Sequence, residues 1–199
     1  MGMKLKKVLD RKVWDRIAKE YQNKKYYGKH LFKKEREILL SLIRRGSSLL
    51  DVACGTGRHV RFFKTHKINA IGLDASKEMI RYAKSISNDR YIIGDAHSLP
   101  FKDHSFDYVT CLGNSIGSLM AEKAIKEMLR VARIKVIVEF RHGGKIEKRL
   151  VGNHSYFVKT WTEEEVGLLL KNFKVKYEII KGQELTTTYF FYAVMDGKP

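Results

Sequence analysis

Apolar residues follow two different spacings along the chain, and the change between them comes near Gly46. Before Gly46, apolar positions recur every three or four residues over 8–21 and 29–43, which predicts two amphipathic helices. After Gly46, short apolar runs alternate with helical stretches. Buried strands are predicted at 48–52, 70–73, 91–93, 108–111 and 135–140, with helices between them at 59–66, 76–86 and 122–132.

The end of the chain departs from this alternation. A helix is predicted to begin at Thr162, where Glu165 completes a capping box, and strands follow at 175–180 and 186–194. A short turn near Gly182 is expected to join these two strands, which makes them antiparallel. Strands that alternate with helices form parallel sheets with right-handed crossovers. The sequence therefore predicts an α/β, Rossmann-like fold: a mostly parallel sheet of seven strands, helices on both faces, an antiparallel last strand and an N-terminal helical cap.

A glycine turn, Ala53-Cys54-Gly55-Thr56-Gly57, follows the first strand and leads into a helix. Glycines let the backbone approach a ligand at the carboxyl end of a strand, where open α/β sheets bind their ligands. A dinucleotide site needs a third glycine where this chain has Val60, and no P-loop pattern is present. The turn predicts a nucleotide-like cofactor without a phosphate cradle, although two glycines after a strand, taken alone, more often mark an ordinary tight turn.

Four elements in chain order resemble class I S-adenosylmethionine methyltransferases, close to the quinone-biosynthesis-like branch that contains many small generic enzymes. The first is the motif D-x-G-x-G-x-G, which Asp51, Gly55 and Gly57 match; Ala53 replaces its first glycine, and His59, two residues beyond the last, continues the alternation without a glycine. The other three are an acid that ends the second strand, a loop after the third strand and the end of the fourth strand. They correspond to Asp74, to Gly94–Phe101 and to Ser105–Ser115, and the resemblance covers residues 49–119.

This resemblance implies S-adenosyl-L-methionine as the cofactor and S-adenosyl-L-homocysteine as the product. Asp74 would accept both ribose hydroxyls, and Asp95 would accept from the adenine amino group. Met79 would pack on the adenine or, equally, serve as a core residue. The expected cofactor-binding residues are Asp51, Ala53, Gly55, Thr56, Gly57, Asp74, Ala75, Met79, Asp95, Ala96 and Leu112.

Asn114 is expected to lie nearest the acceptor, because Leu112-Gly113-Asn114-Ser115 resembles N-methyltransferases of the glycine and sarcosine type. His97, His142 and His154 are candidate proton acceptors, since imidazole titrates near neutral pH. Each of these histidines is also compatible with a surface or structural role. The sequence has no cluster of histidines or carboxylates that would indicate a metal site.

The chain is interpreted as a single domain, 1–199, in four parts. These are a basic helical cap at 1–46, a cofactor-binding core at 47–140, a lid rich in basic and aromatic residues at 141–161, and a C-terminal helix with an antiparallel strand pair at 162–199. By the resemblance, Tyr21, Tyr26 and Tyr27 lie where N-terminal helices of related enzymes cover the cofactor, and core packing is the alternative for each. Cys54 and Cys111 are expected to be reduced, buried thiols at the ends of neighbouring strands.

The formal net charge of +17 is the unusual feature of the composition. Residues 1–46 contain 15 Lys and Arg against 5 Asp and Glu. Such a segment favours RNA or another anionic partner, and a lysine-rich solvated surface accounts for it equally well. No apolar run reaches the roughly 18 residues that span a bilayer, so a cytoplasmic protein with no membrane partner is expected. The sequence leaves the oligomeric state open.

The leading functional hypothesis is methyl transfer to an N or O nucleophile of a small or medium-sized acceptor that is not identified. An enzyme that methylates tRNA or another RNA is the first alternative, because cations beside stacking aromatic residues suit an extruded base. The second alternative is a non-catalytic protein that binds the cofactor. Carboxylates at Asp51, Asp74 and Asp95 oppose it, since a protein without the cofactor has no need for three acids at one sheet edge.

Overall fold

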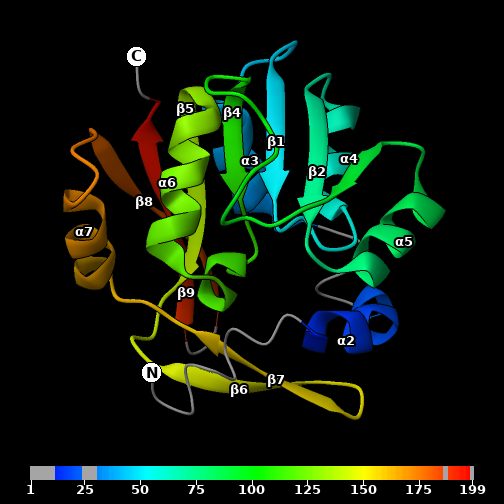
Figure 1. Cartoon of the computed structure of the whole chain (residues 1–199). Coiled ribbons are helices and arrows are strands. Elements are labelled where there is room, and N and C mark those ends of the chain that lie inside the picture. Colours follow the sequence, from blue (N-terminus) through cyan, green and yellow to red (C-terminus); the bar gives the residue numbers. More distant parts are fainter. Residues whose placement is uncertain (1–11, 24–30, 186–187, 198–199) are drawn as a thin grey trace.

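The computed structural model of the chain describes residues 12–23, 31–185 and 188–197. Tyr26 and Tyr27, which are predicted to cover the cofactor, lie outside these ranges. Seven strands form one sheet in the order β3-β2-β1-β4-β5-β9-β8 (Figure 1). The strands from β3 to β5 pair in parallel, and β9 is antiparallel to both of its neighbours, as the sequence predicts. The strands are β1 (Ser48–Val52), β2 (Asn69–Asp74), β3 (Arg90–Ile93), β4 (Phe106–Cys111), β5 (Ala132–Arg141), β8 (Tyr177–Leu185) and β9 (Thr188–Asp196).

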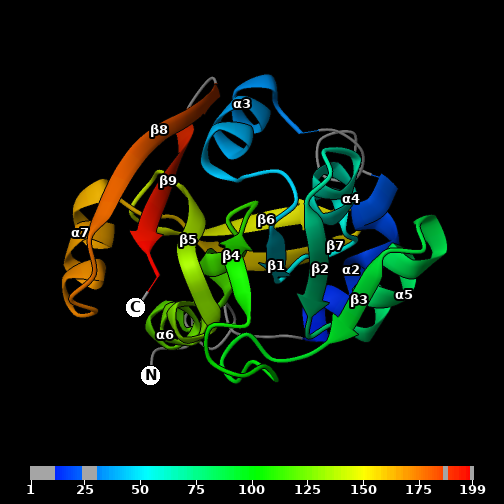
Figure 2. The same ribbon diagram turned by 90° about the horizontal axis from the view of Figure 1, so that it is seen from above.

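Helices cover both faces of the sheet, and adjacent residues of β1 divide the core between them (Figure 2). Leu49 packs on one side with α3 (Lys33–Leu42), α4 (Arg58–Thr65) and α5 (Lys77–Ile86). Leu50 packs on the other side with α6 (Ala121–Val131) and α7 (Glu163–Lys171). Because successive strand residues point to opposite faces, a strand buried on both sides is apolar throughout, as β1 is apart from Ser48 and Asp51.

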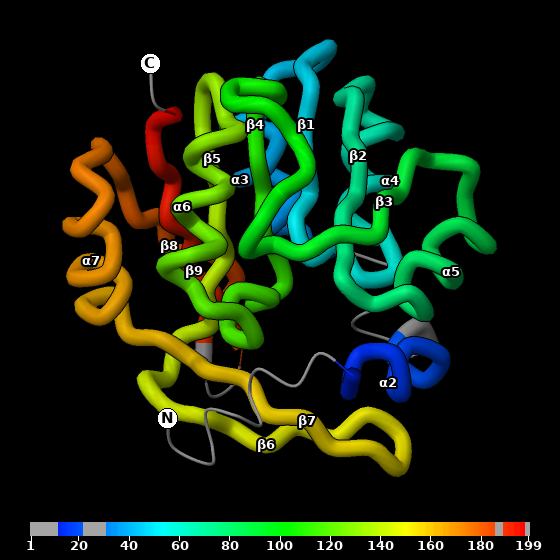
Figure 3. The backbone as a smooth tube through the Cα atoms, in the orientation of Figure 1, coloured from blue at the N-terminus to red at the C-terminus, as the bar shows by residue number. Residues whose placement is uncertain are grey.

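A hairpin of β6 (Ile146–Val151) and β7 (His154–Lys159) lies apart from the main sheet. It crosses beneath the carboxyl ends of the parallel strands together with α2 (Lys12–Asn23), as Figures 1 and 3 show. Val151, Tyr156 and Val158 form a small buried cluster with Val13 and Ile17 of α2. We call α2 and this hairpin the roof.

The prediction of a turn near Gly182 is wrong. Gly182 lies inside β8, which continues to Leu185. The pairing of β8 with β9 shifts register between Lys181 and Glu184. A Cβ atom on Gly182 would lie 2.5 Å from the Tyr192 ring. Gly182 therefore allows β8 and β9 to approach closely at a β-bulge. Glycines within strands are common at such positions.

None of the helices in the described ranges is both long enough and apolar enough to cross a membrane.

Candidate active site

A cleft of about 1200 Å³, measured out to the solvent at its mouth, lies at the carboxyl ends of the parallel strands. Its floor is formed by the glycine turn after β1 and by the segments that follow β2, β3 and β4. The roof closes it through Trp14, Tyr21, Arg149, Tyr156 and Val158. This is the edge at which open α/β sheets bind ligands.

The two glycines of the turn have different functions. Gly55 lines the cleft with a φ of +54°, and a Cβ atom there would meet no protein atom within 4 Å. Open space beside Gly55 is therefore available to a ligand. Gly57 is the N-cap of α4 with a φ of +78°, and its Cβ atom would lie 2.4 Å from the Tyr91 hydroxyl. Gly57 thus shapes the turn by packing against Tyr91 and does not itself line the cleft.

Asp74 ends β2 in the cleft, and backbone donors hold its carboxylate. The Gly55 N–H donates to Oδ2 at 2.8 Å, and the Ser76 N–H donates to Oδ1 at 2.8 Å. Burial raises the pKa of Asp74 to about 6, although both of these hydrogen bonds lower it. The carboxylate joins the ends of β1 and β2, and each oxygen keeps a second lone pair for a ligand hydroxyl.

Asp95 and His97 form a fixed pair in the loop after β3. The backbone N–H of Met120 donates to His97 Nε2 at 3.0 Å, so Nε2 carries no proton. The proton is therefore on Nδ1, which donates to Asp95 Oδ1 at 2.6 Å. His97 uses both ring nitrogens within the protein and does not line the cleft. It serves to orient the Asp95 carboxylate, which does line it.

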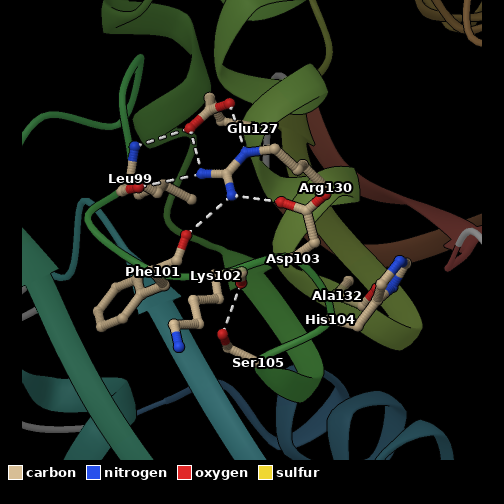
Figure 4. Close-up of polar contacts among 9 residues, drawn as sticks. All are labelled: Leu99, Phe101, Lys102, Asp103, His104, Ser105, Glu127, Arg130 and Ala132. Atoms are coloured by element: carbon tan, nitrogen blue, oxygen red, sulfur yellow. Dashed lines mark hydrogen bonds and ion pairs between the residues drawn. The ribbon is translucent and has the colours of Figure 1, made fainter.

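Arg130 of α6 anchors the continuation of this loop (Figure 4). Its guanidinium donates to the carbonyl oxygens of Leu99 and Phe101, and it contacts the carboxylates of Asp103 and Glu127. Glu127 in turn accepts from the Leu99 N–H at 2.8 Å. These charge-assisted hydrogen bonds fix the segment that follows Asp95 and His97 against a helix of the core.

Asn114 lies at the end of β4, where it starts a short 3₁₀ helix, η1 (Ser115–Ser118), with a φ of +56°. Its Nδ2 donates to the Lys159 carbonyl at 3.1 Å, and its Oδ1 accepts from the Arg141 N–H at 3.0 Å. The side chain lines the cleft and ties β4 to both β5 and the hairpin. Its amide therefore holds the roof in place.

A cluster of buried ionisable groups lies behind the glycine turn. His59 Nε2 lies 2.7 Å from Glu35 Oε1, and an Arg58 guanidinium nitrogen lies 3.6 Å from the same oxygen. Burial raises the pKa of Glu35, but the His59 hydrogen bond and the nearby positive charges lower it by more. Glu139 of β5 accepts from the Tyr192 hydroxyl at 2.7 Å and from the Gly113 N–H, and burial raises its pKa.

Asp51 lies in β1 and is 1% exposed. Thr110 donates to its Oδ1 at 2.8 Å, and Oδ2 is buried with no hydrogen-bond partner among the described residues. Burial raises the pKa of Asp51. An unsatisfied buried acceptor is costly, and one next to a ligand cleft is available to a polar group of the ligand or to a bridging water.

Comparison with known proteins identifies the fold and the family. The family model described as a methyltransferase domain matches residues 49–135. An uncharacterized protein of Methanocaldococcus jannaschii is 34% identical over 123 residues, which are 62% of this chain and about half (47%) of that protein's length. A demethylmenaquinone methyltransferase of Thermotoga maritima is 33% identical over 183 residues, covering 87% of this chain and 79% of the relative. The chain belongs to the class I S-adenosylmethionine-dependent methyltransferases.

Solved structures agree with the fold of this methyltransferase. A Pyrococcus horikoshii protein superimposes with a TM-score of 0.69 and 24% identity, covering 83% of this chain and 89% of that one. A TehB-like S-adenosylmethionine-dependent methyltransferase of Corynebacterium glutamicum gives a TM-score of 0.68 at 19% identity, covering 93% and 98%. The predicted family, fold and cofactor class are thereby confirmed.

The structure brings most of the predicted cofactor residues of the methyltransferase to one cleft. Nine of the eleven line it: Ala53, Gly55, Thr56, Asp74, Ala75, Met79, Asp95, Ala96 and Leu112. Asp51 and Gly57 do not, because Asp51 lies within β1 behind the turn and Gly57 packs on Tyr91.

None of the three candidate proton acceptors lines the cleft. His97 uses both ring nitrogens within the protein, as described above. His142 stacks on Tyr189 with ring centroids 4.5 Å apart. His154 starts β7 and pairs with Val151 at the far end of the hairpin. Asn114 does line the cleft, but its side-chain amide is already hydrogen-bonded to other residues of the protein.

Several cleft residues were not predicted as site residues: Trp14, Arg58, Arg141, Arg149, Tyr156, Val158 and Phe190. Cys54 also lines the cleft, and both cysteines are buried and unpaired, as expected. The described part of the chain contains no group of three or more side chains suited to a metal ion.

If Asp74 binds the ribose, as the resemblance implies, its raised pKa makes cofactor affinity depend on pH. Only the ionised carboxylate can accept from both ribose hydroxyls, so affinity would be full above pH 7 and would fall as the pH drops through about 6. We expect S-adenosylhomocysteine to bind about tenfold more weakly at pH 5 than at pH 7.5. Calorimetry across this range measures the effect. Asp74→Asn should bind weakly with a flat profile, and a flat profile in the wild type would refute this role of Asp74.

Proposed function

We propose that this methyltransferase transfers the methyl group to an N or O nucleophile of a small or medium-sized acceptor. The observation that carries the proposal is the roof. Trp14 of α2 and Tyr156 of the hairpin pack against each other, with ring centroids 4.9 Å apart, and both line the cleft. A cleft closed on this side accepts a molecule of limited size.

The residues in the cleft fit the cofactor. By resemblance to the family, Asp95 would hold the adenine and Asp74 the ribose, so the adenosine part would lie at the ends of β3 and β2. The sheet order then directs the methionyl part toward β1 and β4, beside Gly55 and Arg58. Arg58 would pair with its carboxylate, and the unpartnered Asp51 Oδ2 would accept from its ammonium group, directly or through water. Open space beside Gly55 leaves room for the chain.

S-adenosylmethionine, when bound, supplies a methyl group that is attached to a sulfonium sulfur. This sulfur is the leaving group, and it is a good one. The residues of the protein need only orient the acceptor and exclude water. Asp74 and Asp95 hold the donor, and Trp14 and Tyr156 of the roof shield the cleft from solvent. His59 is the one histidine among the described lining residues, and its Nε2 is engaged with Glu35. A nucleophile that enters with a free lone pair, such as a neutral amine, therefore suits this site.

RNA is the second candidate acceptor, because the chain carries a net charge of +17 and arginines line the cleft. An extruded base would have to enter beneath the roof. The Thermotoga maritima relative supplies a third outcome, since its name describes methylation of demethylmenaquinone.

Methyl-labelled S-adenosylmethionine incubated with the protein and a cell extract separates these outcomes. We expect label in the water-soluble small-molecule pool, and none above background with Asp74→Ala. Label mainly in RNA would support the second candidate, and label in the lipid pool would support a quinone. The proposal fails if no pool gains label while the protein binds the cofactor.

A further inference from the structure

We infer that the acceptor of this methyltransferase carries an anionic group, a carboxylate or a phosphate, on a flat body. The inference rests on the proposed function and names the substrate class for the same cleft. Two arginine–aromatic pairs that line the cleft, one on the wall at β5 and β9 and one in the roof, carry it.

The first pair lies on the main sheet, where Arg141 at the end of β5 is the cross-strand partner of Phe190 in β9. Directly opposed residues of antiparallel strands project from the same face of a sheet. The Arg141 guanidinium lies 5.9 Å from the centre of the Phe190 ring, and both residues line the cleft. The wall at β5 and β9 thus presents a cation beside an aromatic ring.

The second pair lies in the roof and has the same construction. Arg149 of β6 is the cross-strand partner of Tyr156 in β7, and both line the cleft. Lys148 and Leu150, the neighbours of Arg149 in sequence, are exposed on the other face of the hairpin. Because side chains alternate between the two faces of β6, Arg149 points into the cleft. Its side chain is only 19% exposed.

The carboxylates among the described lining residues lie on the floor, together with Arg58, and none lies on the roof or the β5 wall. Asp74 and Asp95 are the only carboxylates among the described lining residues, and both belong to the floor at β2 and β3. Arg149 contacts Glu147, which does not line the cleft. A guanidinium has five N–H donors in a planar fork, so one carboxylate partner leaves donors for a second anion. The roof and the β5 wall therefore favour an acceptor of negative charge.

Aromatic rings from both sides favour a flat acceptor. Trp14 and Tyr156 from the roof and Phe190 from the wall border the same space. Ser118 lines it as well, and its hydroxyl is buried without a hydrogen-bond partner among the described residues. A planar molecule with one anionic group would stack between the rings, pair with a guanidinium and satisfy this hydroxyl.

Binding of small probes to the S-adenosylhomocysteine-loaded protein tests the inference. The probes are benzoate and phenyl phosphate, compared with benzamide, which has the same ring without the charge. We expect either anion to bind at least tenfold more tightly than benzamide. Arg141→Gln and Arg149→Gln should each remove most of this preference, Arg149→Lys should restore part of it, and Lys148→Gln on the outer face should change nothing.

The affinity for S-adenosylhomocysteine distinguishes the two levels of failure. If it does not bind, the proposed function fails. If it binds but benzamide binds as well as the anions, only the present inference fails. A loss of cofactor affinity in Arg149→Gln, equal to the loss of probe affinity, would instead assign Arg149 to the cofactor and overturn the inference.

The labelled product from the cell extract gives an independent check. A strong anion exchanger at about pH 11, where an amine is uncharged and a carboxylate or phosphate is ionised, should retain it. Arg149→Gln should raise the KM for the purified acceptor more than it lowers kcat. A labelled product that passes through the exchanger would overturn the inference and leave the methyl transfer itself intact.

Discussion

Asp74→Ala is expected to weaken binding of S-adenosylhomocysteine by at least about 100-fold. A hydrogen bond to a charged group contributes about 1.5–3 kcal/mol, and on the proposed assignment the carboxylate at the end of β2 accepts two of them from the ribose. Every 1.4 kcal/mol or so is a factor of ten in affinity, so two bonds correspond to a factor of about 100 or more. Calorimetry with the purified protein at pH 7.5 measures the change.

Glu122→Gln is the matched control for Asp74→Ala, because Glu122 is an exposed carboxylate on α6, outside the cleft. It should leave the affinity unchanged. Thermal unfolding of both variants shows whether the loss comes from the site, since Asp74 also holds the backbone of Gly55 and Ser76. An affinity within threefold of the wild type in a folded Asp74→Ala protein would remove Asp74 from the cofactor site.

Gly57→Ala is expected to lower the free energy of unfolding by about 2–5 kcal/mol. Part of the cost, about 1–2 kcal/mol, is the left-handed backbone that Gly57 adopts at a φ of +78°. The rest, about 1–3 kcal/mol, comes from forcing a methyl group against the Tyr91 ring, whose nearest atoms would lie 2.4–2.7 Å away. Urea unfolding measures the sum.

Gly46→Ala separates the two contributions. Gly46 has nearly the same φ, +81°, and a Cβ atom there would meet nothing within 4 Å. It should therefore cost only the backbone part. Tyr91→Ala should relieve much of the penalty in the Gly57→Ala background, so that the double variant loses less stability than the two single changes together. Equal losses in the free energy of unfolding for Gly46→Ala and Gly57→Ala would show that the Tyr91 ring moves aside without a measurable energetic cost.

The floor of the cleft could be predicted because its signals are local. A strand, a glycine turn and a helix follow one another within a few residues at Asp51–Arg58, and parallel strands bring Asp74 and Asp95 to the same edge. The local sequence pattern could not predict the direction in which each side chain points. Asp51 lies in line with the motif, yet the structure places it behind the turn.

The roof could not be predicted residue by residue, because its inward face depends on the register of a hairpin. A shift by one residue would direct Lys148 inward in place of Arg149. Asn114 shows the same limit, since sequence shows a polar residue at a strand end but not that Lys159 and Arg141 engage its amide. Contacts between segments far apart in the chain decide both cases.

The hairpin at 146–159 enters the chain between the last parallel strand of the core and α7, and it makes no strand pairing with the main sheet. On the proposed assignment, the hairpin's share of the acceptor site and the donor site are therefore encoded in separate stretches of the gene. A designer could exchange this one stretch to change the roof side of the acceptor site while keeping the β5 wall, the glycine turn, the acids and the core that supports them.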